Sequence, residues 1–292
     1  MPQALFKYMP YSTADIVLKN QTLRWSTPAT LNDPYDIQFD LRIDFDRSKA
    51  LESSIEKLWK LFTGIVECSK DNPWFEYQQL LQEHYKGVKK EIFAEHMSEG
   101  VRESFAKLDE NIAKAHQETR QLLSTVKILC LTDSPLNQLM WAYYADSNKG
   151  AVLRFEDSEG TESPCRIARQ IDYRAEMPML YDEEKFSDII SGFATTNPNE
   201  IFNSLIYTKS EAWSHEREWR ICSGDGRNKD APYEDLPFDA RELTGVIFGC
   251  RMPKEQKLEL SKRVRQHYPH AELLEAVPIN HSYQLTTAPF EE

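Results

Sequence analysis

The sequence lacks long apolar runs, paired cysteines and the pattern of a secretory leader. No stretch approaches the roughly 18 apolar residues of a membrane span, and the segment from Met1 to Lys19 has no apolar core typical of a signal peptide. The five cysteines are spread widely, and none forms a CxxC pair. These absences predict a cytoplasmic protein that does not enter a membrane, with reduced and mostly buried thiols.

Several motifs of nucleotide, acyl and metal chemistry are also missing. There is no GxGxxG, no GxxxxGK(S/T) and no GxSxG pattern, so Rossmann dinucleotide binding, P-loop hydrolysis and α/β-hydrolase acyl transfer have no support. The seven histidines form no HxxxH, HExxH or HxH pattern. We therefore expect no dedicated transition-metal site.

The balance of charge disfavours a polyanionic partner. The chain carries 47 acidic and 35 basic residues, a formal net charge of -12, so its overall field repels nucleic-acid backbones and anionic lipids. The basic residues between Lys254 and Arg265 are interpreted as the solvated face of one helix. Nucleic acid is therefore not a favoured partner.

What is present indicates a folded α+β protein. Of 292 residues, 40% are hydrophobic and 28% are charged, values typical of a globular chain with a sizeable core. We predict a single domain over residues 1–292, with a mixed, mostly antiparallel β core and a polar C-terminal tail at residues 280–292. Short apolar runs predict its strands, at Leu5–Tyr8, Thr22–Ser26, Lys127–Leu131, Gly150–Phe155, Ile167–Tyr173, His215–Ser223, Leu243–Gly249 and Glu272–Val277.

Residues 48–125 have a helical pattern instead. Apolar side chains recur there at spacings of three and four, in three stripes: Leu51, Ile55, Leu58, Trp59 and Phe62; Tyr77, Leu81, Tyr85, Val88 and Ile92; and Val101, Phe105, Leu108, Ile112, Ala115 and Leu122. This predicts a three-helix insertion that packs on the β core and serves as a lid, a wall or an interaction surface. Further helices are predicted at Thr13–Leu18, Asn137–Ala145, Asn197–Ala212 and Pro253–His267.

Three separated motifs combine polar and aromatic residues. The first contains Lys7-Tyr8, Arg24-Trp25-Ser26 and the turn Asn32-Asp33-Pro34-Tyr35-Asp36. Asn and Asp side chains bond their own backbone in such turns, and proline fixes its φ angle. The segment is equally compatible with a structural turn and with a ligand-contacting loop.

The second motif is Cys130-Leu131-Thr132-Asp133-Ser134, followed by the aromatic segment from Leu139 to Tyr144 and then by Lys149-Gly150. Trp141 and Tyr144 lie three residues apart and would share one face of a helix. Such rings could line the pocket of a planar ligand. Aromatic residues at this density are also typical of a protein core.

The third motif surrounds Glu216 and Glu218, after Lys209 and Trp213. On a strand, Glu216, Glu218 and Arg220 would point to the same face. Mutual repulsion of the two carboxylates can raise one pKa and leave the other group ionised, a separation of roles that suits acid–base or oxocarbenium chemistry. The alternative is a solvent-facing strand on which Glu218 pairs with an arginine across the sheet.

The order of these motifs resembles that of an uncharacterised bacterial family, a domain of unknown function. The resemblance covers most of the chain, through Leu5-Phe6-Lys7-Tyr8, Leu23-Arg24-Trp25-Ser26, Asn32-Asp33-Pro34-Tyr35-Asp36, Met140-Trp141-Ala142-Tyr143-Tyr144, Gly150, Trp213, Glu216 and Glu218-Trp219-Arg220. Tyr143 stands where this pattern is expected to have a histidine. The family defines no established activity.

The layout is also similar, more remotely, to that of the ADP-ribosyltransferases, at the level of fold alone. This resemblance implies a split β core and NAD as cosubstrate. It implies that Glu218 or Glu216 holds the hydroxyls of the nicotinamide ribose and stabilises the cationic sugar as the glycosidic bond breaks. The implied activity is transfer of ADP-ribose to a macromolecule or hydrolysis of NAD, as in a bacterial toxin or defence effector.

The same resemblance implies a set of nucleotide-binding residues. Tyr8 takes the first-strand position at which that superfamily often has His or Arg. Trp141 or Tyr144 would stack on the base, and Arg24 would clamp the pyrophosphate. Further members of the expected NAD site are Ser26, Asn32, Asp33 and Arg220.

Two other functions are compatible with these residues. Asp33, Asp36, Glu216 and Glu218 could hold magnesium or manganese in a metal-dependent hydrolase or nuclease. Alternatively, the aromatic cleft could bind a nucleotide or a peptide without catalysis, while the helical insertion contacts a partner protein.

Overall fold

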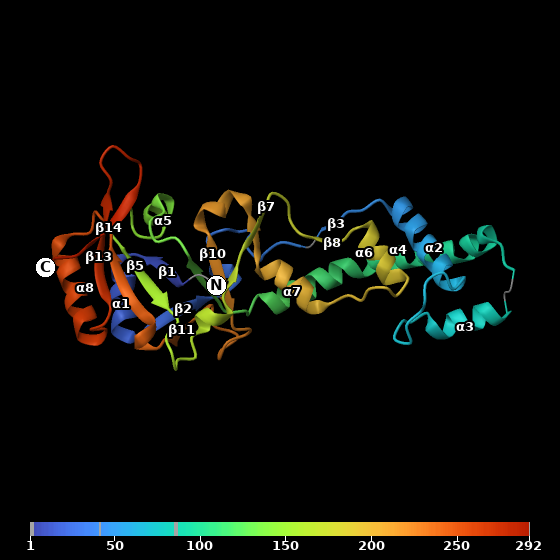
Figure 1. The fold of residues 1–292 in the computed structure, drawn as a ribbon, viewed down its shortest axis with the longest axis horizontal. Helices are drawn as coiled ribbons and strands as arrows, with labels where there is room; N and C mark the ends of the chain where they lie inside the picture. Colours follow the sequence, from blue (N-terminus) through green and yellow to red (C-terminus); the bar gives the residue numbers. More distant parts are fainter. Residues whose placement is uncertain (1–2, 41, 85–86, 292) are drawn as a thin grey trace. The chain divides into compact units, whose positions relative to one another are not determined.

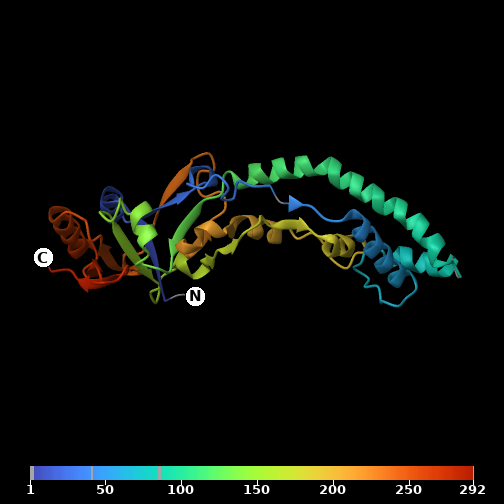
Figure 2. The same ribbon diagram turned by 90° about the horizontal axis from the view of Figure 1, so that it is seen from above.

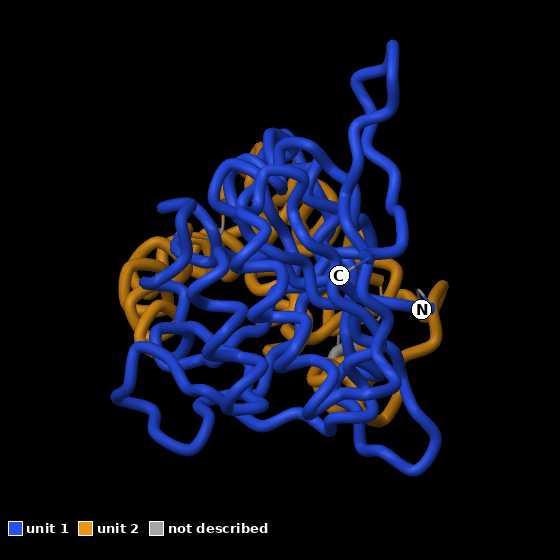
Figure 3. Tube along the Cα trace, turned by 90° about the vertical axis from the view of Figure 1, so that its left-hand side faces the viewer, with its two compact units in different colours: residues 1–38, 122–176, 207–292 blue, residues 39–121, 177–206 orange. Residues whose placement is uncertain are grey.

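The computed structural model describes residues 3–40, 42–84 and 87–291. The chain divides into two compact units (Figure 3). Unit 1 comprises Met1–Gln38, Leu122–Glu176 and Tyr207–Glu292, and unit 2 comprises Phe39–Gln121 and Met177–Ile206. Helices and a mixed, mostly antiparallel sheet confirm the predicted α+β class.

Unit 1 is built on one large sheet (Figure 1). Its path runs β11-β2-β4-β1-β5-β12-β13-β14, and β10 pairs with β4 and with the short strand β6. Within this sheet, neighbouring strands in the described part of the chain are antiparallel, apart from β12 and β13, which are parallel. The bounds are β1 (Ala4–Met9), β2 (Thr22–Ser26), β4 (Ile128–Thr132), β5 (Ala151–Glu156), β6 (Arg169–Gln170), β10 (Glu218–Cys222), β11 (Tyr233–Pro237), β12 (Leu243–Phe248), β13 (Glu272–Pro278) and β14 (Leu285–Pro289).

The sheet is split at β4. One edge of β4 pairs with β10 along its whole length. The other edge is shared, because β2 pairs with it only at Ser26 and Ile128, whereas β1 pairs with it only at Phe6 and Thr132. Between these two points β1 and β2 diverge, so the sheet opens beside Cys130 in the middle of β4.

Alternation along the strands separates the core of unit 1 into two layers. Leu5 and Met9 of β1 join one cluster, and Phe6 and Tyr8 join another, because successive side chains point to opposite faces. The first cluster includes buried residues of α1 (Tyr11–Asn20) and α8 (Lys254–His267), which pack against each other. The second cluster includes residues of α5 (Gln138–Tyr143).

Two of these helices illustrate the local rules. In α5 the Asn137 side chain caps the helix, since it accepts hydrogen bonds from the backbone N–H groups of Leu139 and Met140. In α1 the residues Ala14, Val17 and Leu18 are buried at spacings of three and four, and the helix stops at Gln21 with a left-handed backbone.

Unit 2 is mostly helical (Figure 2). Its α2, α4 and α6 contribute phenylalanines to one core cluster, in which Phe62 stacks on Phe93 and Phe105 stacks on Phe186. The bounds of its elements are β3 (Arg42–Ile43), α2 (Arg47–Phe62), α3 (Phe75–His84), α4 (Lys90–Leu123, of which residues 122–123 lie in unit 1), β8 (Met179–Tyr181), α6 (Glu183–Ile190) and α7 (Pro198–Ile206). In the predicted second stripe, Tyr85 lies outside the described residues, as does the side chain of Leu81.

Several predicted boundaries were wrong near the third motif. The helix expected to run to Ala212 ends at Ile206, because β9 (Thr208–Ser210) pairs in parallel with β7 (Asp172–Arg174). A 3-10 segment, η3 (Glu211–Glu216), follows, so the strand expected from His215 begins only at Glu218.

Other differences lie nearby and at the C-terminus. The strand expected at Ile167–Tyr173 is instead a 3-10 turn followed by β6 and the start of β7. The expected polar tail contains β14, which pairs with β13. Within the described part of the chain, no helix combines the length and the apolar composition needed to cross a bilayer.

Candidate functional site

A pocket of about 250 Å³ lies at the split of the sheet in unit 1. Its walls come from β1, β2, β4, the loop at residues 30–36, the end of α5, and the segment from β9 to β10. The structure brings together on its lining the predicted site residues Tyr8, Arg24, Ser26, Asn32, Tyr144, Glu216 and Glu218. Three other predicted members, Asp33, Trp141 and Arg220, do not line it.

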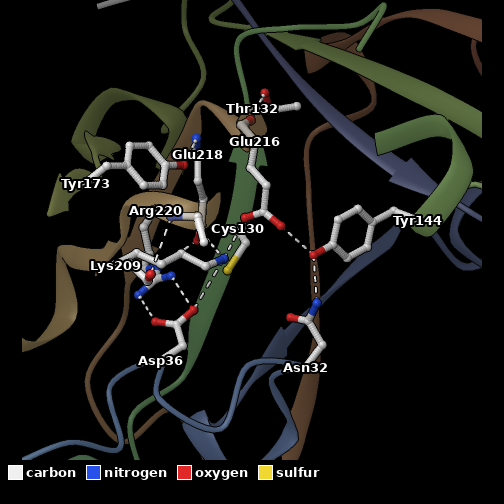
Figure 4. A network of polar contacts seen from close by, with 12 residues as sticks. Asn32, Asp36, Cys130, Thr132, Tyr144, Tyr173, Lys209, Glu216, Glu218 and Arg220 are labelled. Carbon is white, nitrogen blue, oxygen red and sulfur yellow. Dashed lines mark hydrogen bonds and ion pairs between the residues drawn. The ribbon is translucent and has the colours of Figure 1, made fainter. Parts of the chain in front are cut away.

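A buried ion network forms one side of the pocket (Figure 4). The Lys209 ammonium lies 2.5 Å from Glu216, 3.0 Å from Glu218 and 3.5 Å from Asp36. Behind it, Arg220 donates from Nε to Glu218 at 2.8 Å and from its two terminal nitrogens to Asp36 at 3.0 and 2.9 Å. All five side chains are at most 5% exposed.

The backbone around Arg217 directs both glutamates to the same cation. Arg217 has a left-handed φ of 48°, which ends η3 and starts β10. The Thr132 hydroxyl donates to the carbonyl of Glu216 at 2.6 Å, and the backbone N–H of Glu218 donates to the Tyr173 hydroxyl at 2.8 Å. These bonds fix the backbone of Glu216 and of Glu218 on either side of the bend.

The expected rise in the pKa of one glutamate is not found for Glu218. Burial opposes its ionisation, but the positive charges of Arg220 and Lys209 outweigh this and lower its pKa to about 2. Burial likewise opposes the charge of Lys209, whose pKa is nevertheless raised by Glu218, Glu216 and Asp36. The sequence pattern anticipated two facing acids but did not place Lys209 between them or Arg220 behind Glu218.

The network carries one excess negative charge. Among the described residues, the cations that pair with Asp36, Glu216 and Glu218 are Lys209 and Arg220. A low-dielectric site strengthens the field of that excess charge relative to the same charge in water. This side of the pocket is therefore suited to a cationic or hydroxyl-bearing part of a ligand.

Tyr144 links the buried ion network to the turn in the first motif. Its hydroxyl donates to Oε1 of Glu216 and accepts a hydrogen bond from the Asn32 amide at 2.8 Å. Burial and the neighbouring Glu216 carboxylate raise the pKa of Tyr144, so its hydroxyl keeps its proton. Asn32 and Tyr144 thus hold Glu216 from the pocket side.

Tyr8 and Trp141 shape the pocket from within the core. The Tyr8 hydroxyl donates to the carbonyl of Ser134 at 2.8 Å and accepts from the backbone N–H of Asn137 at 3.2 Å. Trp141 is fully buried, packs edge-on against Tyr8, and donates from its ring nitrogen to the carbonyl of Pro135 at 3.0 Å. The expectation that Trp141 stacks on a base is therefore wrong.

Arg24 and Ser26 lie on β2 at the other wall. Arg24 makes a two-point ion pair with Asp235, at 2.9 and 3.0 Å, and lies over the ring of Tyr233. Two of its five N–H donors are committed to Asp235, so the expected bidentate clamp on a pyrophosphate would use the remaining donors of the guanidinium. Ser26 is the last residue of β2 and pairs with Ile128 at the split.

The predicted turn chemistry of the first motif is confirmed. Asp33 accepts a hydrogen bond from the backbone N–H of Tyr35 at 2.9 Å, and its carbonyl accepts from the N–H of Asp36 at 3.1 Å. Asp33 is buried in the turn, whereas Asp36 turns its carboxylate toward Arg220. The four carboxylates suggested for a metal are thus engaged by backbone or by cations, and no cluster of three or more His, Cys, Asp or Glu ligands occurs among the described residues.

Cys130 lines the pocket but is not an activated thiol. Burial, followed by the charge of Glu218, raises the pKa of Cys130 to about 12. The pocket therefore offers carboxylates, a tyrosine hydroxyl and ammonium groups as its chemical groups, rather than a thiolate nucleophile.

Among the lining residues that sequence reasoning left out of the site are two cations, Lys7 and Lys209. Both belong to the motifs that it singled out. The signal that could have found Lys209 is the number of acids, because three buried carboxylates require cationic partners. Its position next to them depends on β9, which was predicted as helix.

The comparisons with known proteins identify a family without an assigned activity. Residues 140–221 match the model of a protein family of unknown function, DUF2971. The match runs from α5 to β10, and so includes Tyr144, Lys209, Glu216, Glu218 and Arg220. Over this segment it confirms the expected resemblance to a domain of unknown function, and the N-terminal motifs lie outside the match. No curated protein matches the chain, and no solved structure does.

Proposed function

We propose that unit 1 is an enzyme that breaks the N-glycosidic bond of NAD and passes ADP-ribose to water or to a macromolecular acceptor. The observation that supports this proposal most is the position of Glu216. Its carboxylate lines the pocket at the split of the sheet and is held there by Lys209 and Tyr144. A carboxylate fixed in a low-dielectric pocket stabilises a developing positive charge.

The reaction needs the negative charge of a carboxylate near the ribose. When the bond between the ribose and the nicotinamide nitrogen breaks, the bonding electrons leave with nicotinamide and the sugar becomes cationic. Glu216 stabilises this cation, and water or an acceptor then adds to the sugar and loses a proton. The excess negative charge that Glu216 shares with Glu218 and Asp36 also stabilises the cationic sugar.

Glu216 is the better candidate than Glu218 for direct contact with the sugar. Both oxygens of Glu218 accept from cations, one from Arg220 and the other from Lys209, whereas Glu216 accepts from one cation and from the neutral Tyr144 hydroxyl. Glu216 shares Lys209, and its second oxygen meets Tyr144, which itself lines the pocket. Glu218 and Arg220 then act as positioning residues that fix Lys209 and Asp36.

The size of the pocket sets how NAD would lie. A volume of about 250 Å³ falls just below the range of roughly 300–1,000 Å³ that encloses a drug-sized ligand. It suits the nicotinamide-ribose half, with the adenosine half extending outside. The free cysteines fit a reducing compartment, and a cytoplasmic location, where NAD is present, is part of the proposal.

The test is release of nicotinamide from NAD by the full chain, followed by chromatography. We expect Glu216→Gln to reduce the rate by about 100-fold or more, in the range seen when one stabilising group is removed from a charged transition state. The variant should fold, because two carboxylates then face two cations. The matched control is Glu255→Gln on the exposed surface of α8, which should keep the full rate. Equal rates for wild type and Glu216→Gln would refute the assigned role.

A second function is favoured by one observation. Two of the three acidic charges are already offset by buried cations, as in a site that recognises a ligand without turning it over. Calorimetry with NAD distinguishes the two functions. Binding without release of nicotinamide would support recognition alone, and release would support the enzyme.

A further inference from the structure

The Lys7 side chain enters the split of the sheet from β1, on the face opposite Phe6 and Tyr8. It lies on β1 between Leu5 and Met9, which belong to the core on the face opposite Phe6 and Tyr8. Because β1 leaves β4 after Phe6, the Lys7 side chain enters the gap and lines the pocket. Its ammonium donates to the carbonyl of Cys130 at 2.6 Å, at the middle of the open β4 edge.

The charge of Lys7 is balanced differently from that of the other cations around the pocket. Arg24 pairs with Asp235, Lys209 with three carboxylates, and Arg220 with Asp36 and Glu218. Among the residues that the structure describes, no carboxylate lies within 4.0 Å of the Lys7 ammonium, and its one hydrogen-bond acceptor there is a neutral carbonyl. An ammonium has three donors, so two remain for a ligand.

A half-buried ammonium gains most from an anionic partner. Charge-assisted hydrogen bonds are about twice as strong as neutral ones, and they are stronger away from bulk water. The whole chain carries a net charge of -12, so its overall field repels anions and a local cation has to attract them. Lys7 provides that cation inside the pocket.

We propose that Lys7 binds a phosphate group of the ligand, so that this pocket selects phosphorylated ribonucleotides over the corresponding nucleosides. The proposal rests on the proposed function in taking the ligand to be a nucleotide. The lining of the pocket then supplies two groups of opposite charge to the ligand. Lys7 takes the phosphate, and Glu216 with Tyr144 and Asn32 takes the ribose hydroxyls.

The experiment is calorimetric titration of the full chain with nicotinamide mononucleotide and with nicotinamide riboside, which differ by one phosphate. We expect wild type to bind the mononucleotide about 10- to 100-fold more tightly, the factor associated with a hydrogen bond to a charged group. Lys7→Gln should bind both compounds with nearly equal affinity. Lys7→Arg should restore most of the preference, since it restores the charge.

The controls separate a binding role from a structural one. Lys254→Gln, on the exposed start of α8, should keep the wild-type preference. If Lys7→Gln lowers the melting temperature, Lys7→Met keeps the apolar stem in the gap and tests the charge alone. A phosphate preference that survives in both variants would overturn the proposal.

Failure of the proposed function is distinguishable from failure of the Lys7 proposal. If neither nicotinamide compound binds, the same titrations are made with AMP and adenosine. A phosphate preference that depends on Lys7 in this second pair would support the Lys7 proposal while contradicting the choice of NAD. If no nucleotide binds, or if wild type shows no preference for the phosphorylated compound, the Lys7 proposal is wrong.

Discussion

Ion pairs in the two units use the same chemical groups in opposite environments. In unit 2, Arg47 pairs with Asp109 and Lys90 with Glu56, and these side chains are 44–53% exposed. In unit 1, Lys209 is 4% exposed and contacts three carboxylates that are at most 5% exposed. Exposed pairs contribute little to stability, whereas removing one partner of a buried network leaves an uncompensated charge.

This comparison distinguishes the charges that serve a ligand site from those that serve the stability of the fold. A buried ion network is seldom more stable than well-packed apolar residues of similar volume. The network of unit 1 lines a pocket, and its acids and cations belong to the segment that matches the family model, apart from Asp36. We therefore interpret its desolvation cost as the consequence of building a charged ligand site.

The largest effect is expected from Lys209→Met. Three buried carboxylates would then face Arg220 alone, and the free energy of unfolding of unit 1 should fall by about 3–5 kcal/mol. Hydrogen exchange resolves the two units, because it reports on β4 and β10 separately from α2. The matched variant Lys90→Met should leave exchange in α2 nearly unchanged. Similar losses in both variants would contradict the distinction between the two kinds of ion pair.

The second-largest effect is a loss of stability at low pH, when Glu218 becomes protonated. Because the folded pKa of Glu218 is about 2, below its ordinary value of 4.5, its ionisation stabilises the fold fully above pH 4.5. That contribution, roughly 3 kcal/mol, is lost as the pH falls from about 4.5 toward 2. A carboxyl carbon NMR titration measures it directly. Protonation of Glu218 above pH 4.5 in the folded protein would show that repulsion between the acids outweighs Lys209 and Arg220.

A smaller effect is expected from Tyr144→Phe. This substitution removes the hydroxyl that donates to Glu216 and accepts from Asn32, so unit 1 should lose about 1–2 kcal/mol. Tyr143→Phe is the matched control, because Tyr143 is 65% exposed. Urea unfolding followed by tryptophan fluorescence compares the two variants. Equal urea midpoints would show that the Tyr144 hydroxyl does not stabilise unit 1.

The smallest effect is expected from Arg47→Gln in unit 2. Its pair with Asp109 is about half exposed, so the free energy of unfolding should change by less than about 1 kcal/mol. The change should shrink further in high salt, because exposed charges are screened. A loss as large as that of Lys209→Met would show that exposure is a poor guide to the value of an ion pair in this protein.

The sequence predicted those features that depend on local rules. The apolar stripe of α2 and the Asx turn at Asp33 follow from side-chain spacing and from bonds between near neighbours. The three motifs also identified most of the pocket lining.

The features that it missed depend on contacts between distant segments. Lys209 reaches the acids because β9 pairs with β7, a tertiary contact that overrides the helical pattern before it. Arg220 was expected beside the ligand but is fully buried behind Glu218, because alternation gives the face of a strand and not its depth. Trp141 was ambiguous for the same reason, and it belongs to the core.

Hydrogen exchange of the full chain with and without NAD tests the central claim most directly. NAD in the pocket should slow exchange in β1, in residues 22–36 and in the segment from β4 to α5, which together form its walls. Exchange in α2 and α3 of unit 2 should not change. Unchanged exchange around the pocket at saturating NAD, or protection confined to unit 2, would contradict the claim that this pocket binds NAD.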